Sequence, residues 1–199
     1  MNKITLSGII TSTPVFSHEV CGEKFFEFKL KSERKSEVAD ELIVNASETL
    51  LSEYTVSGGI VKVVGEIRTY NIHVENGSRL HIYVFAKDIM QYDGYDVNEV
   101  EIDGFICKPP VYRETPKGRE ITDIVVACNR PYGKSDYIPT IAWGRNARRV
   151  GDMVVGTHII ATGRLQSREY LKQYGDGTCE DRVAYDLSVS SIKEVEEQK

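Results

Sequence analysis

The sequence predicts an all-β protein in which two five-stranded barrels follow one another, each with a short helix after its third strand. Three observations support this. The chain repeats itself, since Asn2–Ile10 matches Asn98–Ile106 at an offset of 96 residues. Short β-rich stretches recur in both copies, and glycines fall in the middle of several of them. A repeat of roughly a hundred residues has the size of a domain, so we expect two copies of one fold.

The repeat continues beyond the first strand. Pro14-Val15-Phe16 recurs as Pro110-Val111-Tyr112, and the offset grows to 98 at Gly65 and Gly163 and to 102 between residues 80–83 and 182–185. Insertions in loops produce such a drift in a duplicated domain. We therefore place one domain at residues 1–93 and the other at residues 98–196.

Five strands are expected in each copy, because alternating or continuous apolar stretches are separated by turn signals. In the first copy the strands are expected at residues 4–10, 24–31, 41–46, 60–69 and 80–85. In the second they are expected at residues 100–106, 120–128, 137–143, 158–168 and 183–190. Short helices are expected at residues 48–54 and 145–150. This inventory is that of the oligonucleotide/oligosaccharide-binding fold, the OB-fold.

Glycines fit this plan. Gly8 and Gly104 fall in the middle of first strands, where a missing side chain weakens a strand unless it bends or another backbone comes close. Closure of a barrel requires such bends, and Gly65 and Gly163 repeat the pattern in the fourth strands. Turns between strands are predicted at Gly58-Gly59, Asn76-Gly77, Lys117-Gly118 and Gly175-Asp176-Gly177.

Composition limits the class of protein. Apolar residues make up 41% and charged residues 28% of the chain, and the sequence contains no apolar run as long as a membrane span. The start at Met1 carries no apolar signal segment, so we expect a cytoplasmic protein. The four cysteines and four histidines are scattered without zinc-ligand spacing, so we expect no metal and no cofactor.

Charge is distributed unevenly along the chain. The net charge is −5, which by itself argues mildly against a nucleic-acid partner. Between Lys108 and Lys172, however, there are twelve basic and six acidic residues, whereas residues 1–97 hold ten basic and fourteen acidic ones. Any polyanion should therefore prefer the second copy.

Aromatic and basic residues are interleaved in this basic stretch. Single-stranded nucleic acid needs both kinds of group, flat rings for unstacked bases and fixed cations for phosphates. A stack between a base and a ring is worth on the order of 1–3 kcal/mol, so a few rings suffice. The candidate DNA-binding residues are Tyr112, Arg113, Arg130, Tyr132, Lys134, Tyr137, Trp143, Arg145, Arg164, Arg168, Tyr170 and Lys172.

The alternative is that these rings fill a barrel core. We favour a core position for Tyr185, because it recurs as Tyr83 in the acidic copy. We favour function for Tyr132, Tyr137 and Tyr170, because each lies beside charged and turn residues. For Trp143 the two interpretations are nearly even.

The second copy resembles the bacterial and phage-type single-stranded DNA-binding protein family (SSB), and the whole chain resembles a tandem member of it with two OB-folds. The resemblance rests on residues 100–104, 110–118, 141–144 and 163–170. It implies that DNA stacks on Tyr132, Tyr137, Trp143 and Tyr170, and that Arg164 and Arg168 contact phosphates.

The first copy resembles the family mainly in its scaffold. By the same matching, Ser47 stands at the position of Trp143, Glu41 at that of Tyr137 and Glu66 at that of Arg164. We therefore expect the first copy to have a structural or assembly role and to contact DNA weakly.

Members of the family place four barrels in one particle, so the resemblance implies a homodimer of this chain and association with the nucleoid. Members commonly end in an acidic, aromatic-tipped tail that recruits replication and repair proteins. The sequence given ends at Lys199 without such a tail, so we do not expect that mode of recruitment.

The leading hypothesis is sequence-independent binding and protection of single-stranded DNA in replication, recombination or repair. The alternative is a primosome-type replication-restart adaptor that binds DNA weakly and contacts a helicase or another primosome protein. An enzyme is least expected, because no phosphate-binding loop, zinc-protease motif or Ser/His/Asp grouping is present in the sequence. Stacking alone does not distinguish DNA from RNA.

Overall fold

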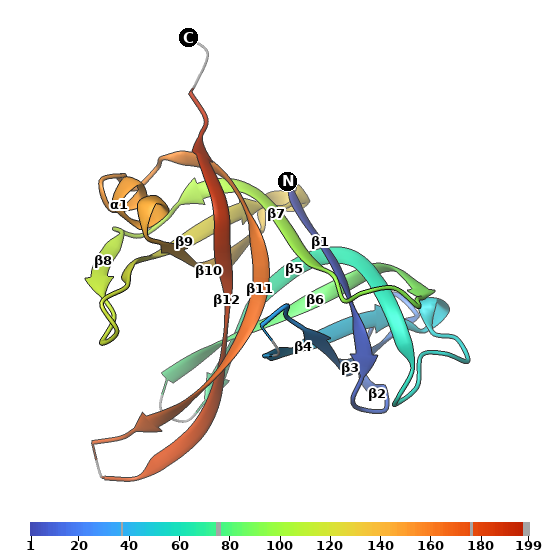
Figure 1. Ribbon diagram of the computed structural model, residues 1–199. Coiled ribbons are helices and arrows are strands. Elements are labelled where there is room, and N and C mark those ends of the chain that lie inside the picture. The colour runs from blue at the N-terminus through green and yellow to red at the C-terminus, as the bar shows by residue number, and fades with distance from the viewer. Residues whose placement is uncertain (37, 75–76, 176, 197–199) are drawn as a thin grey trace.

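The computed structural model describes residues 1–36, 38–74, 77–175 and 177–196. Strands dominate both halves of the chain (Figure 1), so the predicted all-β class is confirmed. Asn76 and Asp176, which belong to two predicted turns, lie outside the described residues.

The elements of the first half are β1 (Asn2–Ile10), β2 (Val15–Val20), β3 (Glu23–Glu33), β4 (Ala39–Ser47), the 3-10 turn η1 (Glu48–Leu50), β5 (Ile60–Val74) and β6 (Gly77–Gln91). Those of the second half are β7 (Asn98–Ile106), β8 (Val111–Glu114), β9 (Glu120–Asn129), the 3-10 turn η2 (Pro131–Gly133), β10 (Ser135–Trp143), α1 (Arg145–Gly151), β11 (His158–Gln173) and β12 (Cys179–Glu194).

In each half, five strands pair in a closed ring. In the first half, β1 pairs with β3 and β5, β4 pairs with β3 and β6, and β5 pairs with β6. In the second half, β7, β9, β10, β12 and β11 pair in the same cyclic order. The short strands β2 and β8, which the sequence did not predict, add to the outer edges of β3 and β9.

Two glycines allow the rings to close. A Cβ atom on Gly8 would lie 2.0 Å from the carbonyl oxygen of Lys31 in β3, and one on Gly104 would lie 2.5 Å from that of Ala127 in β9. Real Cβ atoms do not come so close to backbone, so a side chain at either position would push β1 from β3 or β7 from β9. The predicted close approach of backbone at these two glycines is confirmed.

Apolar side chains fill both rings. Leu30 and Leu42 are fully buried in the first ring, and Ile138 and Ile159 are fully buried in the second. Burial of one such side chain contributes about 1.5–3 kcal/mol to the stability of the fold, so these side chains hold each ring together. The alternate side chains along each strand point outward.

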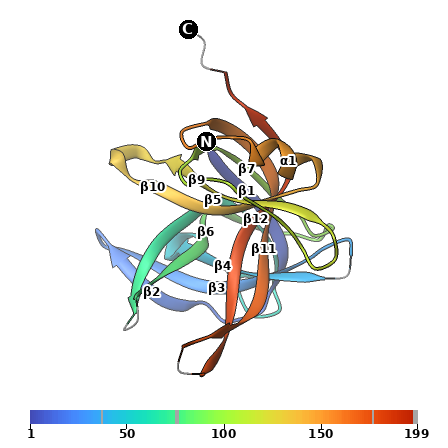
Figure 2. The same ribbon diagram turned by 90° about the vertical axis from the view of Figure 1, so that its left-hand side faces the viewer.

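The two halves are joined through their first strands. β1 and β7 run antiparallel, and Ile4 lies opposite Val100, its own counterpart in the repeat. The halves are therefore related by an approximate twofold axis, and the strands form one twelve-stranded order. The two long hairpins, β5–β6 and β11–β12, extend to the same side of the molecule (Figures 1 and 2).

One predicted helix is wrong. The segment predicted as a helix over residues 48–54 forms only the turn η1, because the chain becomes extended at Leu51. The backbone nitrogen of Ser52 donates to the Thr55 hydroxyl at 3.2 Å, and such local hydrogen bonds compete with helix formation. The helix predicted at residues 145–150 is present as α1.

No helix in the described ranges combines the length and the apolar character that crossing a membrane requires.

Candidate nucleic-acid interface

The register of β10 separates its residues into two sides. Ile138 and Ala142 are buried inside the second ring, so the alternate residues Tyr137 and Trp143 face outward. β9 continues this outward side, because Ile121 lies opposite Trp143 in the ladder.

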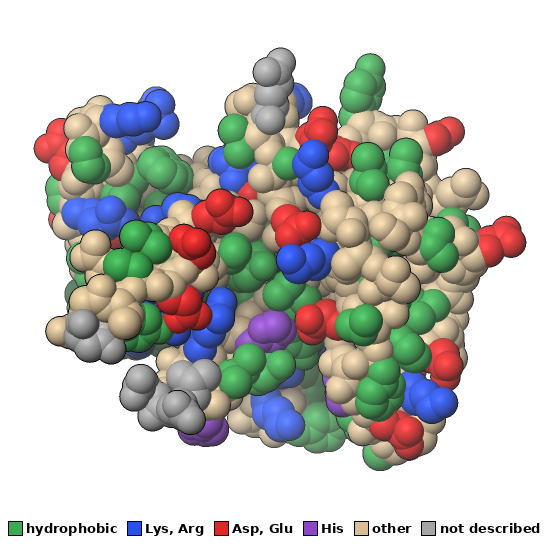
Figure 3. Space-filling view, turned by 90° about the horizontal axis from the view of Figure 1, so that it is seen from below, with side chains coloured by type: hydrophobic (Ala, Val, Ile, Leu, Met, Phe, Trp, Pro, Cys, Tyr) green, Lys and Arg blue, Asp and Glu red, His purple; other side chains and the backbone are tan. Residues whose placement is uncertain are grey.

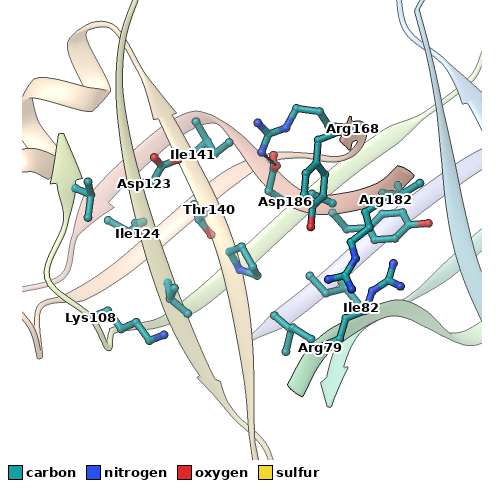
Figure 4. A pocket seen from close by; sticks show the side chains of 18 of the residues that line it. Arg79, Ile82, Lys108, Asp123, Ile124, Thr140, Ile141, Arg168, Arg182 and Asp186 are labelled. Carbon is teal, nitrogen blue, oxygen red and sulfur yellow. Dashed lines mark hydrogen bonds and ion pairs between the residues drawn. The ribbon is translucent and has the colours of Figure 1, made fainter. Parts of the chain in front are cut away.

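A groove of about 520 Å³ opens on this outward side. Its walls come from β9 and β10, from the β11–β12 hairpin and from β6 of the first half. Arg79 of β6 and Arg182 of β12 project into the same part of the groove, and Lys108 lies across from them (Figure 4). We call it the second-half groove; its lining includes Arg79, Lys108, Asp123, Ile141, Arg168, Tyr170, Lys172, Arg182, Tyr185 and Asp186.

Cations outnumber carboxylates in the second-half groove. Its lining holds five Lys or Arg side chains and two aspartates. Burial raises the pKa of Asp186, even though Gln166 and Arg168 donate hydrogen bonds to it. On the face seen from below, Lys and Arg side chains lie among hydrophobic ones, with carboxylates between them (Figure 3). The groove therefore favours a partner that is both anionic and partly apolar.

Three predicted residues of β11 line the groove together. Arg168, Tyr170 and Lys172 alternate along the strand and so project from the same side. Tyr170 is 42% exposed, and the Lys172 ammonium lies 5.2 Å from the ring centre of Tyr174. Arg168 is within 3.5 Å of Asp186 but remains largely exposed. An aromatic ring between two cations is thus available to solvent.

Two further predicted rings lie on the same outward side of β10. Tyr137 is 48% exposed, and its backbone nitrogen donates to the Thr69 hydroxyl at 2.8 Å, which fixes the strand against the first half. Trp143 is half-buried, and its Nε1 donates to the Ser188 hydroxyl at 3.1 Å. Both rings are held on rigid strands, as stacking platforms require.

Tyr132 and Lys134 lie beside this surface, in the turn between β9 and β10. The ring of Tyr132 is fully exposed, and its φ of 65° is unusual for a residue with a side chain. Lys134 ends the turn and is also exposed. The turn therefore presents one ring and one cation directly to solvent.

The remaining predicted residues have other surroundings. Tyr112 lies on the α1 side of β8, and its hydroxyl donates to Glu120 at 2.7 Å. Arg113 forms a two-pronged ion pair with Asp123. Arg145 is exposed at the start of α1. The second-half groove does not include these three side chains.

Arg130 and Arg164 lie where the two halves meet. Arg130 is 3.1 Å from the buried carboxylate of Asp136. Arg164 is half-buried near Arg34 of the first half, and burial is the main cause that lowers the pKa of its guanidinium. Both cations therefore lie at the junction between the halves.

In the first half, three cations are paired with carboxylates. Glu66 forms ion pairs with both Arg68 and Lys87. Glu41 accepts from Lys29 at 2.9 Å, and this contact lowers the pKa of Glu41. The first half therefore offers less free positive charge than the second.

Sequence reasoning missed three cations of the groove as site residues, namely Arg79, Lys108 and Arg182. Arg182 lies opposite Tyr170 in the β11–β12 ladder, so counting outward from the predicted turn at Gly175 and Gly177 could have found it. Arg79 belongs to the first half, and no local signal indicated that β6 reaches the second-half groove.

The segment of the chain that carries most of this surface matches a known protein family. The profile described as "Single-strand binding protein family" matches residues 97–195, which contain β8–β12 and most of the groove. The second half of the chain belongs to the single-strand binding protein family. Within the described residues, no group of three or more His, Cys, Asp or Glu side chains is placed to hold a metal ion.

Several relatives carry the family name. Single-stranded DNA-binding protein 2 of Chlorobaculum tepidum is 28% identical over 114 residues, which are 52% of this chain and 74% of that protein. Single-stranded DNA-binding protein 1 of Staphylococcus aureus is 33% identical over 86 residues, which are 40% of this chain and 52% of that protein. The chain thus spans about half the length of the Staphylococcus relative.

A solved structure matches the whole chain. A deletion variant of the single-stranded DNA binding protein from Thermus aquaticus superimposes with a TM-score of 0.81 at 17% identity, covering 100% of this chain and 96% of that chain. The wild-type form gives a TM-score of 0.79. At this identity the likeness concerns the fold, and it includes the first half, which the family profile does not match.

Proposed function

We propose that this protein binds single-stranded DNA without sequence specificity and protects it during replication, recombination or repair, with no catalytic step. The observation that carries the proposal is the second-half groove, in which exposed Tyr170 lies between Arg168 and Lys172 within the segment that matches the family. The relatives named above are single-stranded DNA-binding proteins, which supports the same ligand class.

The groove suits single strands better than duplexes. Unstacked bases can lie on Tyr170 in the groove and on Tyr137 and Trp143 on the outward side of β10, while the groove cations neutralise phosphates. A duplex keeps its bases stacked inside and would offer these rings no partner. Because rings accept any base face, the binding is expected to tolerate all sequences.

We further propose that each ring of strands is an OB-fold barrel and that the first half, residues 1–93, mainly supports assembly. Three of its cations, Lys29, Arg68 and Lys87, are paired with Glu41 or Glu66, which weakens its attraction for phosphate. Two copies of the chain would then form a homodimer with four barrels. Light scattering can test this by measuring the mass of the particle in solution.

A titration of fluorescently labelled oligo-dT tests the function, with anisotropy as the readout and a duplex of equal length as control. We expect the single strand to bind more tightly. The logarithm of its affinity should fall linearly with the logarithm of salt concentration, with a slope of about 0.7 for each phosphate neutralised. Affinity that does not respond to salt, or a preference for the duplex, would contradict the proposal.

A further inference from the structure

The first half contains a second cavity at the position equivalent to the second-half groove. It has a volume of about 360 Å³, at the lower end of the ~300–1,000 Å³ range of small-molecule sites. Asn45 of this cavity corresponds in the repeat to Ile141 of the groove, Glu27 to Asp123 and His81 to Ala184. The first-half cavity is therefore a version of the groove with different chemistry.

Two polar atoms in this cavity have no hydrogen-bond partner. Asn45 is 3% exposed, and its amide oxygen is buried and unpartnered. The Nε2 atom of His81 is also buried without a hydrogen bond, since the Glu27 carboxylate is 3.7 Å away. A buried polar atom without a partner destabilises the protein, so a ligand that forms hydrogen bonds with both atoms would recover that cost.

Aromatic rings form one wall of the cavity. The ring centre of Tyr70 is 4.9 Å from that of His81 and 6.0 Å from that of Tyr83. Tyr70 is half exposed, so the wall can be reached from solvent. This wall suits a flat ring rather than an alkyl chain.

The charge of the cavity disfavours phosphate. Among the residues that the structure describes, its lining contains the carboxylate of Glu27 and no Lys or Arg. Arg68, in the neighbouring strand β5, is occupied by Glu66 and Asp136. The part of a nucleotide that fits here is therefore the base, and its edge must carry a hydrogen-bond donor for the amide oxygen of Asn45.

We propose that the first-half cavity binds one nucleobase with an exocyclic amine beside a ring acceptor, which is the pattern of cytosine and adenine. The amine donates to the amide oxygen of Asn45, and the ring nitrogen next to it accepts from His81 in the tautomer that carries a proton on Nε2. Thymine presents a carbonyl oxygen in place of the amine and an N–H in place of the ring acceptor, so its oxygen would face the Asn45 oxygen and its N–H would face that of His81.

If the bound base belongs to a DNA strand, this inference rests on the proposed function. It then gives the first half a role in base preference that the second-half groove lacks. A free nucleoside offers the same chemistry. The test therefore compares oligo-dC with oligo-dT, which have pyrimidines of equal size, and adds free cytidine and thymidine as a separate arm.

The decisive variant is Asn45→Ile, which installs the residue of the other copy and removes the acceptor. Tyr70→Ala removes part of the ring wall and is a second, exposed variant that disturbs the core less. Thermal unfolding shows whether each variant is folded. Oligonucleotide affinity is measured by anisotropy, and nucleoside binding by saturation-transfer NMR.

The wild-type protein is expected to bind oligo-dC about fivefold to tenfold more tightly than oligo-dT, as one base-edge contact provides. Asn45→Ile should remove this difference while leaving oligo-dT affinity unchanged.

If free cytidine binds in preference to thymidine while the two oligonucleotides bind with equal affinity, the cavity is a nucleoside site. Equal binding within both pairs, or a preference for cytosine that survives Asn45→Ile, would overturn the inference. Failure of every oligonucleotide to bind would overturn the proposed function instead, and the nucleoside arm would still decide the cavity.

Discussion

The Oδ1 atom of Asp136 accepts a hydrogen bond of 2.8 Å from the backbone nitrogen of Thr69, across the boundary between the two halves. The repeat copies this contact, since Oδ1 of Asp40 accepts from the backbone nitrogen of Ser167 at 2.8 Å. Each half thus uses a buried aspartate on its third ring strand to hold the long hairpin of the other. Because β6 also lines the second-half groove, this contact helps to keep the groove in shape.

Replacement of Asp136 by alanine should strongly destabilise the fold. Asp136 is fully buried, bonds to Arg68 at 2.9 Å and lies 3.1 Å from Arg130, so its loss removes a carboxylate from two partly buried cations and the acceptor from a backbone donor. The expected decrease in the free energy of unfolding is about 3–5 kcal/mol. Urea unfolding measures it, with Asp93→Ala at an exposed site as the matched control. An equal, small effect of both variants would show that the contact does not hold the halves together.

Tyr170→Ala and Tyr137→Ala should each weaken binding of oligo-dT. Loss of one base stack corresponds to an affinity about 5-fold to 100-fold lower. Tyr95→Ala is the control, because Tyr95 is almost fully exposed and lies outside the groove. Anisotropy titrations compare the three variants. Unchanged affinity in both Tyr170→Ala and Tyr137→Ala would remove these rings from the interface.

Lys172→Gln should reduce the salt dependence of binding. If Lys172 neutralises one phosphate, the slope of log affinity against log salt should fall by about 0.7. Arg148→Gln removes the same charge from α1, where Arg148 is bound to Glu120 at 2.7 Å outside the groove, and should leave the slope unchanged. An equal change of slope in the two variants would indicate a diffuse effect of net charge.

Cys128 should react with thiol reagents only after unfolding. Burial raises the pKa of the Cys128 thiol from 9.0 to about 12. Between these two pH values the folded protein keeps the thiol proton, whereas the unfolded chain has lost it. The folded state then binds more protons above pH 9, and stability should fall as pH rises from about 9 to about 12. Urea unfolding at pH 7 and pH 10 should show a larger loss for the wild type than for Cys128→Val. The exposed Cys21 and Cys179 serve as reactive internal standards in a thiol-reagent assay.

Much of the fold could be predicted because it depends on local pattern. The repeat offset identified Val100 as the counterpart of Ile4, and the mid-strand glycines Gly8 and Gly104 marked the positions of close backbone approach. The short strand β8 was missed because it is exposed throughout and has no buried side to produce a pattern.

The site was only partly predictable. Arg168, Tyr170 and Lys172 share one side of a strand, which alternation shows from the sequence. Tyr112 and Arg113 are adjacent, so alternation also requires that they face opposite ways, and the structure places Tyr112 against α1. The contribution of β6 could not be predicted, because it depends on how the two halves dock.

The most direct test of the account is the fluorescence of Trp143, the single tryptophan of the chain, during titration with oligo-dT at low and high salt. Trp143 is half-buried on the outward side of β10 and bonded to Ser188, so a strand on this side changes its surroundings. We predict strong quenching at low salt that weakens as salt increases, in step with binding measured by anisotropy. Binding that leaves the Trp143 signal unchanged would place the DNA elsewhere and contradict the assignment of the second half as the DNA-binding surface.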